Sequence, residues 1–387
     1  MSERNEKLFD VIICGGGPAG STCALALADS GLKVAVIEKQ KFPRDKVCGD
    51  AIAAYVHKVL NTINPKFKDA LSEFKEKVMV DTCRIVAPNA NAFDITFSQS
   101  GFISTRVSWD NFLYELASVQ NNITYFLNHA VTEVIIDSTK CETIVQTEHT
   151  SFKGKIVIGC DGAHSIINKK IVGTKPDLNH YSGAVRAYYK NVTGIPDRTF
   201  ELHFIKGLSP GYFWIFPLKD NLANVGLGAL SASISKQKLN LRKIFEDAIH
   251  NVSYLKERFK DAEQIGQLEG FGLPLGSRKV VMSGDNFMLC GDAASLIDPL
   301  SGEGIGQAMV SGRYAGWQAK KCFDQNNFTG TFMKQYDKLV YDKFWARHRK
   351  NYLIQQMIGK REWLLNGVVN LTSRNRFIKD LLMRALN

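Results

Sequence analysis

The chain lacks the features that would place it among membrane-spanning, secreted or zinc-binding proteins. No apolar run approaches the ~20 residues needed to cross a bilayer. The N-terminal segment, Met1 to Leu8, is charged, which does not fit a secretory signal. Its eight cysteines form no Cys-x-x-Cys pair and no Cys/His pairing suited to zinc, and a disulfide framework is implausible at this length. We therefore expect a cytoplasmic protein without a metal site.

Internal repeats and low-complexity linkers are also absent. At 387 residues the chain exceeds one typical core, so about two domains are expected. The net charge of +11 is uneven, because residues 334–387 hold twelve Lys and Arg against four Asp and Glu. Apolar residues recur there at helical spacing and predict amphipathic helices: Tyr352, Leu353, Ile354, Met357, Trp363, Leu364, Leu365, Phe377, Ile378, Leu381 and Leu382. We expect a helical cap with a basic outer face, and no nucleic-acid partner. Peripheral attachment to the inner face of an anionic membrane is the alternative.

One glycine-rich turn has the pattern of a dinucleotide site. The apolar run from Phe9 to Cys14 breaks into Gly15, Gly17 and Gly20 and then into a helix-forming segment. Glycines let a pyrophosphate approach the backbone and rest on the N–H groups of the helix start. A second apolar run ends on Glu38, whose carboxylate can accept both hydroxyls of an adenosine ribose. The sequence therefore predicts a strand, turn and helix that bind a dinucleotide.

Two later segments each place a carboxylate just after an apolar strand. Asp161 follows the run that begins at Lys155, and Asp292 follows the run that begins at Asn286. Open parallel sheets bind ligands at this end of their strands. Either residue could alternatively be an ordinary helix cap. With a flavin present, Asp292 can hold the ribityl chain, and the helix start after Gly302 can direct its N–H groups at the ring.

These motifs resemble those of the p-hydroxybenzoate-hydroxylase-like superfamily of FAD enzymes, over about residues 8 to 330. Within it, the segment Pro43 to Gly49 (Pro-Arg-x-Lys-x-Cys-Gly), together with the strand Tyr212 to Pro217, is similar to the geranylgeranyl reductase family. The family pattern more often reads Cys-Gly-Gly, so Asp50 is a departure. The resemblance implies an α/β fold: a Rossmann-like FAD-binding domain, an inserted antiparallel-sheet substrate domain and a C-terminal helical segment.

We expect the FAD-binding domain to comprise residues 1–80, 98–180 and 275–330, and the substrate domain to comprise residues 81–97 and 181–274. Residues 331–387 form the C-terminal helical segment. Alternating apolar residues between Gly183 and Phe271 predict the antiparallel sheet, and Ser235 to Tyr254 is expected to be one helix on it.

The motifs and the resemblance together give a set of residues expected to contact FAD. The arginine at 106 is implied to lie along the flavin, and Arg44 is expected to neutralise the pyrophosphate. The full set is Gly15, Gly17, Pro18, Ala19, Gly20, Glu38, Lys39, Arg44, Lys46, Cys48, Gly49, Arg106, Val131, Asp161, Gly162, Gly291, Asp292, Pro299, Gly302, Gly304, Ile305 and Gly306.

Three residues are candidates for the chemistry. Cys48 lies where the chain would return toward the flavin ring, and its thiol could donate a proton, gate the flavin or only pack beside it. Tyr212 and Trp214 alternate with Phe216 along one strand, so the three side chains share a face. That face could line an apolar substrate, with the Tyr212 hydroxyl as its polar group, or could be ordinary sheet core.

The leading functional hypothesis is an FAD-dependent reductase of carbon–carbon double bonds in a prenyl lipid or quinone chain. Its reductant would be NAD(P)H or a reduced electron carrier. The chain has no second glycine-rich turn for a nicotinamide cofactor, so such a donor would bind transiently near the flavin. One alternative is an FAD monooxygenase or halogenase acting on an aromatic substrate. Another is a non-catalytic prenyl-binding protein, which the retained flavin motifs make the weakest of the three.

Overall fold

The computed structural model describes residues 5–360, 366, 367, 369 and 370. Its first sheet is six-stranded, and adjacent strands are parallel except at the β17–β18 edge. Short apolar runs buried on both faces are typical of such sheets. The order is β17 (Ser283–Gly284), β18 (Phe287–Leu289), β11 (Ile156–Gly159), β2 (Val11–Cys14), β3 (Val34–Ile37) and β7 (Ile123–Phe126).

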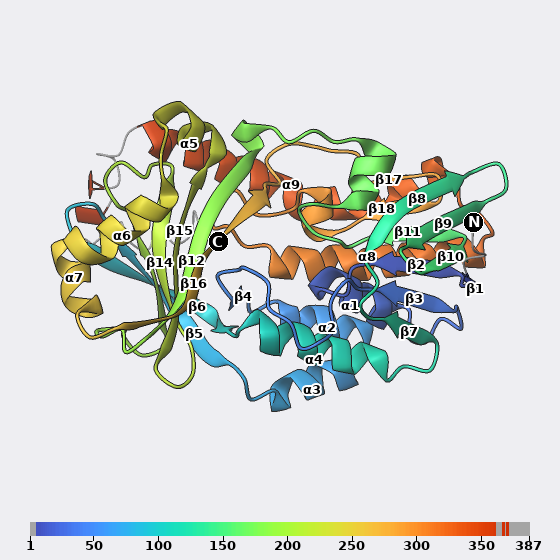
Figure 1. Ribbon diagram of the computed structural model, residues 1–387, viewed down its shortest axis with the longest axis horizontal. Coiled ribbons are helices and arrows are strands. Elements are labelled where there is room, and N and C mark those ends of the chain that lie inside the picture. Colours follow the sequence, from blue (N-terminus) through green and yellow to red (C-terminus); the bar gives the residue numbers. More distant parts are fainter. Residues whose placement is uncertain (1–4, 361–365, 368, 371–387) are drawn as a thin grey trace.

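Helices surround this sheet on the right of Figure 1. The helix α1 follows β2 directly and packs closely on α8. A Cβ added at Gly312 of α8 would lie 2.1 Å from the carbonyl oxygen of Ala19, so only glycine permits this approach. The helices of this part of the molecule are α1 (Pro18–Ala26), α2 (Val56–Ile63), α3 (Pro65–Glu73), α4 (Arg106–Ser118) and α8 (Ile305–Asp324), with a 3-10 turn at Gly291–Ala294.

The second sheet has eight strands and is mainly antiparallel, with a parallel pairing between β13 and β5. Its order is β16 (Glu263–Pro274), β12 (Tyr181–Lys190), β15 (Leu222–Leu230), β14 (Gly211–Pro217), β13 (Thr199–His203), β5 (Val78–Val86), β6 (Ala92–Ile103) and β4 (Ala51–Ile52). Two distant parts of the chain therefore build one sheet, and the predicted α/β fold class is confirmed. The residue boundaries of the domains stay predictions.

The outer face of the eight-stranded sheet carries three short helices, at the left of Figure 1. They are α5 (Ser231–Gln237), α6 (Leu241–Asn251) and α7 (Ser253–Phe259). The prediction of one helix from Ser235 to Tyr254 is wrong. Lys238 adopts a left-handed conformation (φ 52°) that ends α5, and the Asn240 side chain caps α6 by accepting from the Lys243 N–H at 3.1 Å.

The third sheet among the described residues has four strands. Its order is β1 (Asn5–Leu8), β10 (Thr150–Gly154), β9 (Glu142–Thr147) and β8 (Val131–Asp137). Short helical turns lie at Asn168–Val172 and Leu178–His180.

The long helix α9 (Gly330–Lys360) reaches from the six-stranded sheet to the eight-stranded sheet (Figure 1). The Tyr336 hydroxyl near its start donates to the carbonyl of Leu289 in β18 at 2.6 Å. At its end, Gly359 lies against Pro210, just before β14. The predicted apolar positions at and beyond residue 363 lie outside the described residues. Within those residues, no helix is long and apolar enough to span a membrane.

Candidate active site

The glycine-rich turn has the close backbone contacts that require glycine. Gly15 has φ +101°, and an added Cβ there would lie 2.3 Å from the Cys160 carbonyl oxygen. A Cβ at Gly20 would lie 1.8 Å from the carbonyl oxygen of Gly15. The buried Glu38 carboxylate, at the end of β3, accepts from the N–H of Gly16 at 2.9 Å. Strand, turn, helix and terminal acid are therefore arranged as a dinucleotide site needs them.

Two guanidinium groups lie over this turn. A Cβ added at Gly17 would lie 3.5 Å from Arg44 Nη2 and 3.9 Å from Arg106 Nη2. Asp110 accepts from Arg106 Nε and Nη2 at 2.7 and 2.6 Å and from Arg44 Nη1 at 2.7 Å. Burial alone would raise the pKa of Asp110, but its two guanidinium partners hold it below its usual value. Positive charge beside the N-terminus of α1 fits the pyrophosphate of FAD.

The two predicted carboxylates have different environments. Asp161 caps the helical turn that follows it, because its Oδ2 accepts hydrogen bonds from the N–H groups of Ile166 and Ile167 at 2.7 and 3.3 Å. Its Oδ1 is buried and has no hydrogen-bond partner among the described residues. Asp292 instead pairs with Lys46 Nζ at 2.9 Å and lies close to Gly304, at the start of α8. Asp292 therefore lies between the loop that holds Lys46 and the glycine-rich start of α8.

Aromatic residues of β14 form the inner face of the eight-stranded sheet. Tyr212, Trp214 and Phe216 belong to one apolar cluster, as the alternation predicted. The neighbouring strand β15 has glycines opposite two of them, and a Cβ at Gly226 would lie 2.3 Å from the Trp214 ring. Absent side chains on β15 thus let the indole lie flat across the sheet. We call this surface, formed by Tyr212, Trp214, Phe216 and the facing strand β15, the aromatic face.

The loop with Cys48 packs on the aromatic face. A Cβ at Gly49 would lie 3.2 Å from the Phe216 ring. Asn224 of β15 accepts from Trp214 Nε1 at 2.9 Å and donates to the Cys48 carbonyl at 2.7 Å. The Cys48 side chain also interacts with the guanidinium of Arg106. The structure therefore brings together Cys48, the aromatic face and the residues above the glycine turn.

The aromatic face also touches the segment expected to hold the flavin ring. The Tyr212 hydroxyl donates to the Ser301 carbonyl at 2.5 Å, and a Cβ at Gly302 would lie 2.9 Å from that hydroxyl. Burial raises the pKa of Tyr212, so its phenol stays protonated at neutral pH. Asp298 and Pro299, in the same segment, accept from Asn351 and Gln355 of α9 at 2.8 and 2.5 Å.

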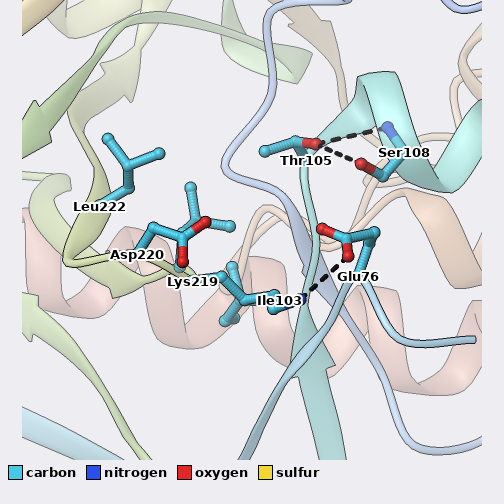
Figure 2. A pocket seen from close by; sticks show the side chains of 8 residues that line it. Glu76, Ile103, Thr105, Ser108, Lys219, Asp220 and Leu222 are labelled. Carbon is cyan, nitrogen blue, oxygen red and sulfur yellow. Dashed lines mark hydrogen bonds and ion pairs between the residues drawn. The ribbon is translucent and has the colours of Figure 1, made fainter.

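Figure 2 shows a small pocket of about 90 Å³. Ile103 and Leu218 line it and belong to the same apolar cluster as Trp214. Its polar rim carries the ion pair of Lys219 with Glu76, at 2.9 Å. Figure 2 also shows Thr105, which directly precedes Arg106 and caps α4, and Ser108 in the first turn of that helix. The pocket therefore has an apolar floor and a charged rim.

Comparisons with known proteins find related FAD enzymes. Residues 10–167 match the family model of FAD dependent oxidoreductases, and residues 181–267 match that of the geranylgeranyl reductase catalytic domain. A solved structure from Thermoplasma acidophilum, described as geranylgeranyl bacteriochlorophyll reductase-like, superposes with a TM-score of 0.83 at 25% identity, covering 96% of this chain and 93% of that one. An FAD-bound halogenase superposes with a TM-score of 0.74 at 16% identity, covering 97% and 86%, which shows the fold alone.

Fold, site and family match together define an FAD-dependent oxidoreductase. The curated relatives include digeranylgeranylglycerophospholipid reductases of Thermoplasma volcanium, 28% identical over 95% of this chain and 92% of the relative, and of Methanococcus vannielii, 29% identical over 96% and 92%. The chain is similar to the geranylgeranyl reductases over almost its whole length, and residues 181–267 match their catalytic-domain model. The predicted resemblance to this family and the predicted class of FAD-dependent oxidoreductase are thereby confirmed, whereas the reductant stays a prediction.

The individual site residues remain predictions, but their placement can be described. Pro18 and Ala19 are buried in α1, and Ile305 and Gly306 begin α8. Lys39 is exposed directly after Glu38, whereas Val131 begins β8 in the four-stranded sheet. Gly162 and Gly291 have φ of +81° and +58° in the turns after β11 and β18.

Sequence reasoning missed Asp110, Tyr188 and Asn224, and it treated Asp50 only as a departure from a pattern. A signal existed for Asn224, which is the one side chain with hydrogen-bonding groups in the strand Leu222–Leu230. Tyr188 and Asn224 are register partners on adjacent strands, a relation that the sequence does not contain.

Proposed function

We propose that this protein reduces carbon–carbon double bonds of a geranylgeranyl-type prenyl chain, on a lipid or a quinone, with FAD as its redox cofactor. The observation that carries the proposal is the aromatic face, which meets both the Cys48 loop and the flavin-side segment at Ser301 and Gly302. A flat apolar surface of this kind suits a prenyl chain. The named activity of the curated relatives supports the same substrate class.

The chemistry requires a proton as well as a hydride. When bound, FAD supplies the hydride in its reduced state. Hydride addition to an isolated trisubstituted alkene would leave an unstabilised carbanion, so a proton must move first or at the same time. Protonation at the less substituted carbon places cationic character on the tertiary carbon. The chain must therefore provide an acid beside an apolar surface that excludes water.

Cys48 has the position for a part in this reaction, because its loop lies between Arg106 and the aromatic face. We propose that Cys48 contacts the reacting region and that Trp214 and Tyr212 form the wall along which the prenyl chain lies. The pocket beside Leu218 extends this wall toward solvent, and we propose it as the point where the chain enters.

The reductant is proposed to be NAD(P)H or a reduced electron carrier that binds transiently. The basic C-terminal segment is proposed to aid contact with a membrane that holds the substrate, since each Lys or Arg near an anionic surface contributes about 1 kcal/mol. Sedimentation with anionic vesicles should then decrease as the salt concentration rises, and no binding at low salt would contradict the membrane contact.

Anaerobic single-turnover kinetics test the proposed function. The photoreduced enzyme is mixed with a geranylgeranyl lipid, and flavin reoxidation and the saturated product are followed together. We expect reoxidation without oxygen and a product gaining two hydrogens per bond. Two results together would reject the proposed function. The reduced flavin would not be reoxidised by any prenyl substrate, and in air the enzyme would form a halogenated or hydroxylated product from an aromatic compound.

A pair of cysteine variants tests the role of Cys48. Cys48→Ala should keep FAD and accept electrons yet transfer them to substrate ~10²- to 10⁴-fold more slowly if the thiol assists proton transfer. Cys141→Ala is the matched control, because Cys141 is also a free, half-buried thiol but lies at the β8–β9 turn. Equal rates for the two variants would show that Cys48 only packs.

A further inference from the structure

Asp50, two residues after Cys48, is a carboxyl group enclosed within the site. It is fully buried, and its backbone has φ +65°, a conformation that Asp and Asn adopt more readily than most residues. Its Oδ2 accepts from the Tyr188 hydroxyl and from Asn224 Nδ2, both at 2.8 Å. Its Oδ1 has no hydrogen-bond partner among the described residues. One oxygen is thus held by two hydrogen bonds, and the other is buried without a hydrogen bond.

The charges around Asp50 do not compensate a buried carboxylate fully. Arg186 of β12 faces it but already pairs with Asp45 at 2.8 Å and with Glu269 of β16 at 3.4 Å. Tyr188 lies between the two, with the Arg186 guanidinium 4.3 Å from its ring centroid. Burial raises the pKa of Asp50 to about 7, against the lowering effects of Asn224, Arg186 and Tyr188, while Asp45 raises it further.

Position in the sheet connects this acid to the aromatic face. Tyr188, Asn224 and Phe216 are register partners across β12, β15 and β14, so their side chains form one row on the same face. Asn224 contacts Trp214, the Cys48 carbonyl and Asp50 at once. The Asp50 carboxyl group therefore contacts two members of a row whose third member, Phe216, belongs to the proposed substrate wall.

We propose that Asp50, in its protonated form, is the acid that donates the proton to the prenyl double bond. This inference rests on the proposed function. The O–H bond of Asp50 breaks, and the π electrons of the alkene form a C–H bond to that proton. The tertiary carbon, left electron-deficient, would take the hydride that reduced FAD supplies when bound. NAD(P)H or a reduced electron carrier would then return two electrons to the oxidised FAD. Asp50 remains as a carboxylate and must be reprotonated.

The residues around Asp50 extend toward solvent. Asp45 and Glu269 are 37% and 49% exposed at their side chains and hold Arg186, which stacks on Tyr188. The Tyr188 hydroxyl donates to Asp50, so Tyr188 lies between the buried acid and the ion pairs of Arg186. Burial and the neighbouring Asp50 raise the pKa of Tyr188, which keeps this phenol protonated throughout.

The test compares Asp50→Asn and Tyr188→Phe with the parent enzyme, each with FAD bound. Asp50→Asn keeps the shape and the left-handed conformation but cannot donate the proton. It should keep FAD and be reduced by dithionite as the parent is, yet reoxidise on a geranylgeranyl lipid ~10²- to 10⁴-fold more slowly. Asp247→Asn, on the exposed side of α6, is the control and should react at the parent rate.

The pH dependence provides a readout that a structural role would not move. In the parent, the substrate half-reaction should slow as pH rises through about 7, where Asp50 loses its proton. Tyr188→Phe removes a hydrogen bond that favours the ionised form, so its decline should shift to higher pH. Asp50→Asn should show no decline in this range.

Infrared difference spectra supply a measurement that needs no substrate. The parent should show the C=O stretch of a protonated carboxyl at pH 5.5 that disappears through about pH 7 and is absent in Asp50→Asn. Absence of that band in the parent, or parent-like rate and pH profile in Asp50→Asn, would overturn the role of Asp50. A parent enzyme that reduces no prenyl lipid would instead reject the proposed function, and this role with it.

Discussion

The protonation of Asp50 has a consequence for stability that can be worked out and measured. The pKa rises from 3.8 in the unfolded chain to about 7 in the folded protein. A raised pKa means that the folded state binds a proton which the unfolded state has lost, so this group stabilises the fold at low pH. That contribution is complete below pH 3.8 and is lost as pH rises through about 7.

The magnitude follows from the pKa difference. Each pKa unit corresponds to about 1.4 kcal/mol, so the full effect is at most about 4 kcal/mol. Between pH 5.5 and pH 8 the folded group loses its proton while the unfolded group is already ionised. The parent should therefore lose roughly 2 kcal/mol relative to Asp50→Asn over this interval. Asn at this position keeps an oxygen that can accept from Tyr188 and Asn224.

Denaturant unfolding at the two pH values measures this difference. Both proteins are loaded with FAD at the same free concentration, because ligand binding adds its own stability. The comparison between parent and Asp50→Asn cancels other titrating groups, as long as the slope of the transition is unchanged. If the free-energy difference between the two proteins is the same at pH 5.5 and 8, Asp50 does not take up a proton on folding and the reasoning fails.

Three further predictions concern other parts of the structure. Asp292→Ala should weaken FAD binding about tenfold or more in a fluorescence titration, because a charge-assisted hydrogen bond is worth ~1.5 to 3 kcal/mol. An unchanged Kd would show that Asp292 pairs with Lys46 but does not bind FAD. Gly20→Ala should abolish FAD uptake, since its Cβ would overlap the Gly15 carbonyl, whereas Gly367→Ala, whose Cβ meets no described atom within 4 Å, should bind normally. Burial lowers the pKa of His348 to about 4, so His348 reduces the free energy of unfolding as pH falls from 6.5 toward 4. In His348→Phe, denaturant unfolding should show a smaller decrease in this free energy over the same pH range. An equal decrease in the parent and the variant would contradict the prediction.

The sequence was sufficient for features that depend on consecutive residues. The glycine turn, the acid at the end of β3 and the alternation of Tyr212, Trp214 and Phe216 all follow from short-range periodicity and turn chemistry. The structure agrees because each of these segments satisfies its local preference and its burial at once. For the same reason, the resemblance to the geranylgeranyl reductases and the use of FAD could be predicted before any contact was known.

Features that depend on strand register could not be predicted. Asp50 becomes a buried acid only because β12 and β15 pair so that Tyr188 and Asn224 meet beside it. The helix expected from Ser235 to Tyr254 divides because Lys238 is left-handed and Val252 is extended, and periodicity alone reveals neither. Both outcomes depend on where distant or irregular backbone is placed.

The segment from Asp298 to Gly304 explains how the two sheets can act as one site. On one side, Asn351 and Gln355 of α9 donate to Asp298 and Pro299. On the other side, the Tyr212 hydroxyl of the aromatic face donates to Ser301. A loop held from both sides loses little further freedom when cofactor and substrate bind, which favours a preorganised geometry. The long helix therefore contributes to the position of the reacting groups, although none of its described side chains needs to touch the substrate.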